Sequence, residues 1–123
     1  MNDGRLMMGK NGMPKTKKLS VKAAIREMVR RIVKQFDPEK IILFGSQARG
    51  DAGPDSDVDL LVVMRVEGSK FDKTVEIRGT LHDIDVSKDV VVTTPEDFAW
   101  RSKHVGTIEY PAVKEGKVVY ERR

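Results

Sequence analysis

The sequence contains no cysteine and only two histidines among its 123 residues. The absence of cysteine excludes a disulfide framework and a cysteine-ligated zinc site. The two histidines, His82 and His104, are too few for a histidine-based metal centre, and we expect both to lie on helix surfaces. Any metal ion would therefore be held by carboxylate oxygens, which suit Mg²⁺ or Mn²⁺.

Long hydrophobic runs are also missing. No segment approaches the roughly 20 apolar residues of a membrane span, and the N-terminus lacks the apolar core of a signal peptide. These absences predict a cytoplasmic protein without a membrane partner. The chain has 123 residues, a length that allows one hydrophobic core but not a second.

The positive charge is unevenly placed along the chain. Residues 1–19 hold five basic residues and one acidic residue, so they account for the whole formal net charge of +4. Residues 1–18 show no hydrophobic period and are predicted to be a disordered basic tail, followed by a single domain over residues 19–123. Because a short basic tail is more often solvated than bound to nucleic acid, we do not expect a nucleic-acid partner.

Apolar residues recur every three or four positions between Val21 and Phe36. This period predicts an amphipathic helix with Ser20 as its N-cap, and the helix must end near Asp37 because a residue before proline disfavours the helical region. Further helices are predicted over residues 46–49, 70–81, 95–104 and 106–115, the last kinked or shortened by Pro111. Ser69 and Thr94 are the candidate N-caps of the helices that start at residues 70 and 95. The inner face of the helix over residues 70–81 is expected to hold Phe71, Thr74, Val75, Ile77 and Leu81.

Short β-branched runs predict four strands, over residues 40–44, 57–66, 84–93 and 117–120. The second strand is apolar on both faces after Asp59, which is typical of a central strand. In the third strand, Asp85 and Asp89 share one face, because alternate residues of a strand point to the same side.

The stretch from Ile41 to Met64 joins two of these strands and carries the candidate chemistry. Asp57 and Asp59 are two residues apart on a strand, so their Cα atoms lie about 7 Å apart on one face. Two carboxylates this close repel each other unless a cation lies between them, and Mg²⁺ is such a cation. Upstream, the backbone N–H groups of the Gly45-Ser46 turn can bind the phosphates that such a metal also ligates.

The segment GSQARGDAGPDSDVD, residues 45–59, resembles the signature of the DNA polymerase beta-type nucleotidyltransferases, and in detail that of the minimal stand-alone MNT proteins. The resemblance continues through KDVVVTTPEDF at residues 88–98 and KEGKVVY at residues 114–120. It implies an α/β (α+β) domain with the nucleotidyltransferase fold, a mixed sheet of about four strands flanked by helices. It also implies that three carboxylates bind two Mg²⁺ ions and a nucleoside triphosphate, usually ATP, with Mn²⁺ as a possible substitute.

In this family pattern Asp57 and Asp59 match the first two carboxylates, which ligate both metals. The third matches Asp89 better than Asp85, because in the family it stands at the start of the strand that runs into a Thr-Pro-Glu helix. Since Asp85 and Asp89 share strand parity, spacing alone leaves both open. The third carboxylate would hold the catalytic metal and accept the proton of the attacking hydroxyl.

The same resemblance assigns Gly45 and Ser46 to the β- and γ-phosphates of the nucleotide. Arg49 also belongs to the pattern and is a candidate to neutralise phosphate charge. Its alternative role is an ion pair with the nearby Asp51 or Asp55.

The resemblance further implies a partner, because prokaryotic MNT proteins are typically paired with a small helical HEPN toxin. We therefore predict an Mg²⁺-dependent nucleotidyltransferase that transfers AMP from ATP to a protein acceptor, as the antitoxin of a HEPN/MNT pair. Two alternatives remain. The chain could neutralise its partner by binding alone, without catalysis, or it could modify a small molecule as antibiotic nucleotidyltransferases do.

Overall fold

The computed structural model describes residues 19–53 and 56–123, so the tail predicted at residues 1–18 lies outside the described residues. The helices are α1 (Val21–Phe36), α2 (Ser46–Arg49), α3 (Lys70–Leu81), α4 (Pro95–Arg101) and α5 (Glu109–Glu115). The strands are β1 (Lys40–Phe44), β2 (Val58–Val63), β3 (Lys88–Thr93) and β4 (Lys117–Glu121). In the part of the chain that the structure describes, none of the helices combines the length and apolar composition that a membrane span requires.

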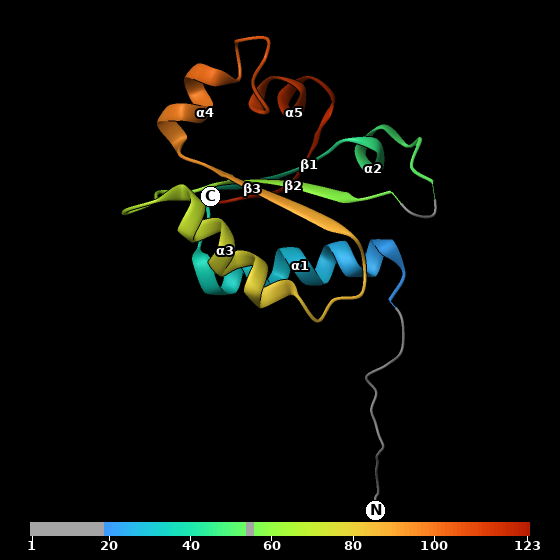
Figure 1. Cartoon of the computed structure of the whole chain (residues 1–123). Helices are drawn as coiled ribbons and strands as arrows, with labels where there is room; N and C mark the ends of the chain where they lie inside the picture. Colours follow the sequence, from blue (N-terminus) through green and yellow to red (C-terminus); the bar gives the residue numbers. More distant parts are fainter. Residues whose placement is uncertain (1–18, 54–55) are drawn as a thin grey trace, which may run out of the picture.

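The four strands form one mixed sheet in the order β3-β2-β1-β4. Strands β2 and β3 are parallel, with α3 as the crossover between them, whereas β1 is antiparallel to both of its neighbours, β2 and β4. Helices α1 and α3 lie on one side of the sheet, and α4 and α5 lie on the other (Figure 1). The predicted mixed sheet of four strands flanked by helices is therefore confirmed, and β2 is central, as its apolar character predicted.

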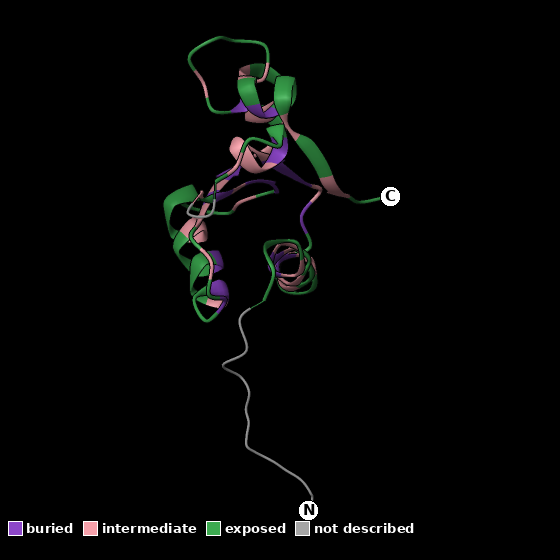
Figure 2. Cartoon of the chain, turned by 90° about the vertical axis from the view of Figure 1, so that its right-hand side faces the viewer, coloured by how far each residue is buried: buried purple, intermediate pink, exposed green. Residues whose placement is uncertain are grey.

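The main hydrophobic core lies between the sheet and the α1/α3 layer. Helix α1 buries Ala24, Met28 and Ile32, which are spaced by one helical turn and therefore face the sheet together. A smaller cluster on the opposite face packs Ile42 and Leu61 against Ala112 of α5. Buried residues accordingly gather on the sheet and on the inner sides of the helices (Figure 2). Because β2 is covered on both faces, the backbone that carries the side chains at the start of this strand is held in place by the core.

Three helix starts follow the predicted capping chemistry. The side-chain oxygens of Ser20, Ser69 and Thr94 each accept a hydrogen bond from the backbone N–H three residues later, at 3.1 Å in every case. These caps satisfy N–H groups that have no partner within the helix. The predicted N-terminal bounds of α1, α3 and α4 are therefore confirmed.

Other predicted bounds were wrong. Strand β2 ends at Val63 and not at residue 66, and α5 begins at Glu109 and not at residue 106. Pro111 therefore falls in the first turn of α5, where its missing N–H costs no intrahelical bond. The inner face predicted for α3 was wrong in its N-terminal half, because Phe71 and Val75 are 74% and 53% exposed, and it is confirmed at Ile77 and Leu81. The buried residues of α3 are Ile77 and Leu81, so it is the C-terminal half of this helix that packs on the core.

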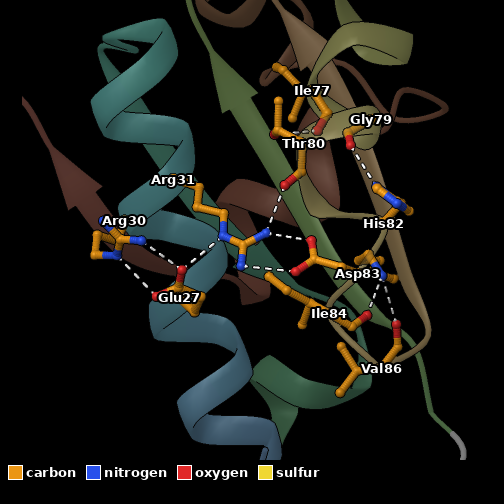
Figure 3. A network of polar contacts seen from close by, with 11 residues as sticks. Glu27, Arg30, Arg31, Ile77, Gly79, Thr80, His82, Asp83, Ile84 and Val86 are labelled. Atoms are coloured by element: carbon orange, nitrogen blue, oxygen red, sulfur yellow. Dashed lines mark hydrogen bonds and ion pairs between the residues drawn. The ribbon is translucent and has the colours of Figure 1, made fainter. Parts of the chain in front are cut away.

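Strand β3 begins at Lys88 and not at 84, because residues 84–87 form an irregular turn after α3. A polar network holds this turn (Figure 3). Arg31 of α1 donates to the Thr80 carbonyl at 2.9 Å and to Asp83 Oδ1 at 2.6 Å. The Lys88 Nζ donates to the carbonyls of Ile84 and Val86, at 2.7 and 3.1 Å. The turn that leads from α3 into β3 is thus tied both to α1 and to the first residue of β3.

Candidate functional site

The candidate site lies where β1 ends and β2 and β3 begin. Gly45, the residue after β1, is the N-cap of α2 and has a φ of +75°, in the left-handed region that favours glycine. Its neighbour on the adjacent strand β2 is Asp59, which is paired in register with Phe44. A Cβ atom on Gly45 would lie 2.3 Å from Asp59 Oδ2. Glycine is therefore required here both for its backbone conformation and for the space that the carboxylate occupies.

The predicted short helix after Gly45 is confirmed. The Gly45 carbonyl accepts the N–H groups of Ala48 and Arg49, each at 3.1 Å, and Ala48 is buried beneath the turn. Ser46 is the first residue of α2 and is half-buried. This arrangement brings the start of α2 beside Asp59, and the assignment of Gly45 and Ser46 to nucleotide phosphates stays a prediction.

The parallel pairing of β2 and β3 brings together acidic residues that are thirty positions apart. Asp59 and Asp89 are register partners. One step earlier, beside the strand ends, Ser87 Oγ donates a hydrogen bond to Asp57 Oδ1. Asp57, Asp59 and Asp89 thus stand at one end of the same strand pair, close to Gly45.

The ionisation of the half-buried Asp59 carboxyl is affected by this crowding. Burial, and then the negative charges of Asp57 and Asp89, raise the pKa of Asp59 above its ordinary value. The ionised form of Asp59 is therefore destabilised by its surroundings, and a cation held between these carboxylates would relieve that cost.

The structure distinguishes the positions of Asp85 and Asp89. Asp85 is exposed and lies in the turn before β3, so the shared strand parity that kept it as an alternative does not exist. Asp89 lies within β3, beside Asp59. Position in the sheet therefore favours Asp89, and the role of either residue as the third carboxylate stays a prediction.

The side chains suit a hard divalent cation in their chemistry, because the donors are carboxylate oxygens and the charge of Asp59 is destabilised by its neighbours. Within residues 19–53 and 56–123, however, no three His, Asp or Glu side chains converge closely enough to hold a metal ion. Asp89 is instead paired with Arg78 of α3. Asp57 and Asp59 thus offer carboxylate oxygens to a metal ion, although Asp57 also accepts from Ser87, whereas Asp89 would have to exchange Arg78 for the metal.

Arg49 forms the ion pair that was predicted as its alternative role. Its Nε lies 3.3 Å from Asp51 Oδ2 and its Nη1 lies 3.4 Å from Glu115 Oε1, whereas Asp55 lies outside the described residues. Even so, the positive charge of Arg49 acts on Asp59: it opposes the rise in the Asp59 pKa that burial, Asp57 and Asp89 cause, and it is the smallest of these effects. Arg49 is therefore near enough to influence the site electrostatically, and its contact with phosphate stays a prediction.

Sequence reasoning missed two residues of this site, Ser87 and Arg78. Ser87 could have been found by aligning β2 with β3, because Asp57 and Asp59 then face Ser87 and Asp89. Arg78 gives no such signal. It looks like any basic residue in the last turn of a helix, and its partner is set by the turn that follows.

The chain is similar in sequence to known nucleotidyltransferases. The family described as "Polymerase beta, Nucleotidyltransferase" matches residues 27–123. A relative from Methanocaldococcus jannaschii, named "putative protein adenylyltransferase", is 33% identical over 100 residues, which cover 79% of this chain and 95% of the relative.

Solved structures agree with this match at the level of the fold. A "putative nucleotidyltransferase" from Sulfolobus solfataricus superposes with a TM-score of 0.56 at 25% identity, over 90% of this chain and 94% of the other. A mutant of the toxin–antitoxin MntA-HpeT superposes with a TM-score of 0.54 at 20% identity, over 85% of this chain and 76% of the other. A toxin–antitoxin solved with AMP-PNP gives a TM-score of 0.51 at 17% identity, with the same coverage.

Proposed function

Because the chain belongs to the polymerase beta-type nucleotidyltransferase family, we propose that it transfers AMP from ATP to a hydroxyl of a protein acceptor. The nucleotidyltransferase activity follows from the family, and the choice of AMP and of a protein acceptor is supported by the name of the archaeal relative. The observation that carries the proposal is the crowding of Asp57 and Asp89 around Asp59, directly beside the Gly45 turn.

In the proposed reaction the acceptor oxygen bonds to the α-phosphorus of ATP, the bond from that phosphorus to the β-phosphate oxygen breaks, and pyrophosphate leaves. Asp57 and Asp59 would hold two Mg²⁺ ions, or Mn²⁺ in their place, which supply charge neutralisation at the phosphates. Asp89 would hold the catalytic metal ion and accept the proton of the attacking hydroxyl. Gly45 and Ser46 hold the β- and γ-phosphates, and Arg49 adds positive charge nearby.

The proposed partner is a HEPN toxin, with this chain as its antitoxin. Support comes from the fold, which is shared with the MntA-HpeT toxin–antitoxin. We place the reaction in the cytoplasm, where ATP is abundant. A hydroxyl on the toxin is the acceptor, so its modification would block the toxin covalently.

The test is transfer of label from ATP carrying ³²P at the α-phosphate to any HEPN protein that is encoded beside the gene for this chain. We expect Asp57→Asn and Asp59→Asn each to lose at least ~100-fold in rate, the loss typical of removing a charge-stabilising group. Asp72→Asn, an exposed acid in the first turn of α3, is the matched control. No transfer to the neighbouring HEPN protein would contradict the proposed acceptor. Full protection from the toxin by Asp57→Asn would mean that the antitoxin acts by contact alone.

A further inference from the structure

Arg78 and Asp89 form an ion pair across the connection between α3 and β3. Arg78 lies in the last turn of α3, and its guanidinium donates from Nη2 to Asp89 Oδ1. Both side chains are about half exposed, at 53% and 48%. The two residues are eleven positions apart in the sequence. The turn over residues 82–87 brings the end of α3 back to the acidic end of the β2/β3 strand pair.

The turn that creates this contact is braced from two sides. Arg31 of α1 holds the Thr80 carbonyl and Asp83, and Lys88 bonds two carbonyls within the turn (Figure 3). These bonds fix the end of α3 relative to the start of β3. The short distance between Arg78 and Asp89 is therefore set by the packed fold and not by a loose loop.

The pair lies at the point where the proposed metal chemistry needs an empty carboxylate. Asp89 is the register partner of Asp59, and its negative charge is felt there. A guanidinium on Asp89 Oδ1 satisfies that oxygen and supplies a positive charge at the edge of the acidic cluster. A divalent cation and Arg78 would thus compete for the same oxygens, since both are attracted by the same charge.

We propose that Arg78 is an internal counter-ion that holds Asp89 in the metal-free protein and must release it before Asp89 can ligate a metal. This rests on the proposed metal role of Asp89. The exposure of the pair makes the exchange feasible, because exposed ion pairs are weak. Metal binding and release of the arginine are then one coupled event, and the freed guanidinium remains beside the site.

The experiment measures Mn²⁺ binding to the full chain without nucleotide or acceptor, by electron paramagnetic resonance of the free ion and by calorimetry. Arg78→Met removes the competing cation while keeping a helix-forming side chain. We expect the variant to bind Mn²⁺ about two- to fivefold more tightly than the unchanged chain. The matched control is Arg65→Met, because Arg65 pairs with Glu96 at 3.5 Å and is also exposed, yet it follows the opposite end of β2.

A second pair of variants separates the contact from a general loss of positive charge. In an Asp89→Asn background Arg78 has lost its ionic partner, so Arg78→Met should leave Mn²⁺ affinity unchanged. Tightening that persists in this background, or that equals the effect of Arg65→Met, would overturn the proposal. So would unchanged or weaker Mn²⁺ binding in Arg78→Met alone, and so would the absence of saturable Mn²⁺ binding in any of these proteins.

These results are independent of the AMP-transfer assay. Unchanged Mn²⁺ affinity together with intact transfer would remove the role of Arg78 and leave the proposed reaction standing. Tighter Mn²⁺ binding in Arg78→Met together with no transfer to the HEPN protein would support the role of Arg78 and contradict the proposed acceptor. Circular dichroism of each variant checks that the helical content is the same.

Discussion

Gly45 and Asp59 approach each other so closely that a methyl group on Gly45 would lie 2.3 Å from Asp59 Oδ2. There is therefore no room for a larger residue at Gly45 while the Asp59 carboxylate keeps its position. Neither can be shifted without the other, because Gly45 directly follows β1 and Asp59 lies in the neighbouring strand β2, which is buried on both sides.

The first prediction follows from this contact. Gly45→Ala should lower the rate of AMP transfer by at least ~100-fold, because the new methyl group displaces the Asp59 carboxylate from its position in the site. The rate is measured with the α-labelled ATP assay at saturating metal.

The matched control is Gly68→Ala. Gly68 also has a positive φ, +94°, but a Cβ there would meet nothing within 4 Å. Both variants should lose roughly 1 kcal/mol of stability from backbone strain. A similar loss of activity in both would show that strain, and not the displaced carboxylate, limits the Gly45 variant.

The second prediction concerns the third carboxylate. Asp89→Asn should reduce AMP transfer at least ~100-fold, whereas Asp85→Asn should change it less than ~3-fold, because Asp89 lies in β3 beside Asp59 and Asp85 lies in the exposed turn. Single-turnover rates of the two variants provide the comparison. The reverse order of the two effects would move the third ligand to Asp85.

The third prediction is a pH dependence of stability. Hydrogen bonds from Arg30 and then Arg31 lower the pKa of Glu27 from its ordinary 4.5 to about 2. Because the folded-state pKa is depressed, the stabilisation is fully present above pH 4.5 and is lost as the pH falls towards 2. Glu27→Gln should therefore cost about 1 kcal/mol at pH 7, and the gap to the unchanged chain should close between pH 4.5 and pH 2.

Urea unfolding at several pH values measures this gap. Glu76→Gln is the control, because Glu76 pairs with Lys73 on an exposed face of α3. A gap for Glu27→Gln that stays constant across the acidic range would show that the two arginines do not depend on the charge of Glu27.

The fourth prediction concerns the join between the sheet and α5. Thr93 ends β3 and is buried, and its hydroxyl donates to the buried Glu109 carboxylate at 2.8 Å. Thr93→Val removes one of the bonds that compensate this buried charge, so it should cost about 1.5–3 kcal/mol of unfolding free energy. Thr74→Val, which removes an exposed hydroxyl bond to the Lys70 carbonyl, should cost less than ~0.5 kcal/mol. Equal costs would mean that Glu109 finds another donor.

Local signals explain what could be predicted from the sequence. The bounds of β1 and the N-terminal caps of α1 and α3 depend on residues within a few positions, such as Pro38, Gly45 and Ser69, and these were predicted correctly. The proximity of Asp57 to Asp59 is likewise local. The family resemblance extended this to Asp89, which no spacing rule connects to β2.

The features that escaped prediction depend on distant contacts. Val86 reads as a strand residue, yet its carbonyl bonds to Lys88 in a turn that is also tied to α1. Phe71 follows the helical period of α3, but only the C-terminal half of that helix reaches the core. The partner of Arg78 is set by that same turn, so it could be identified only once the turn was known.

The position of β1 between β2 and β4 has a consequence for synthesis. Strand β1 is made early, but β4, its second neighbour, follows all the other strands. Until β4 has emerged from the ribosome, one edge of β1 offers unpaired N–H and C=O groups. A growing chain therefore contains Asp57, Asp59 and Asp89 before β1 is held on both sides, so the strand that leads into Gly45 is fixed only after β4 has been made.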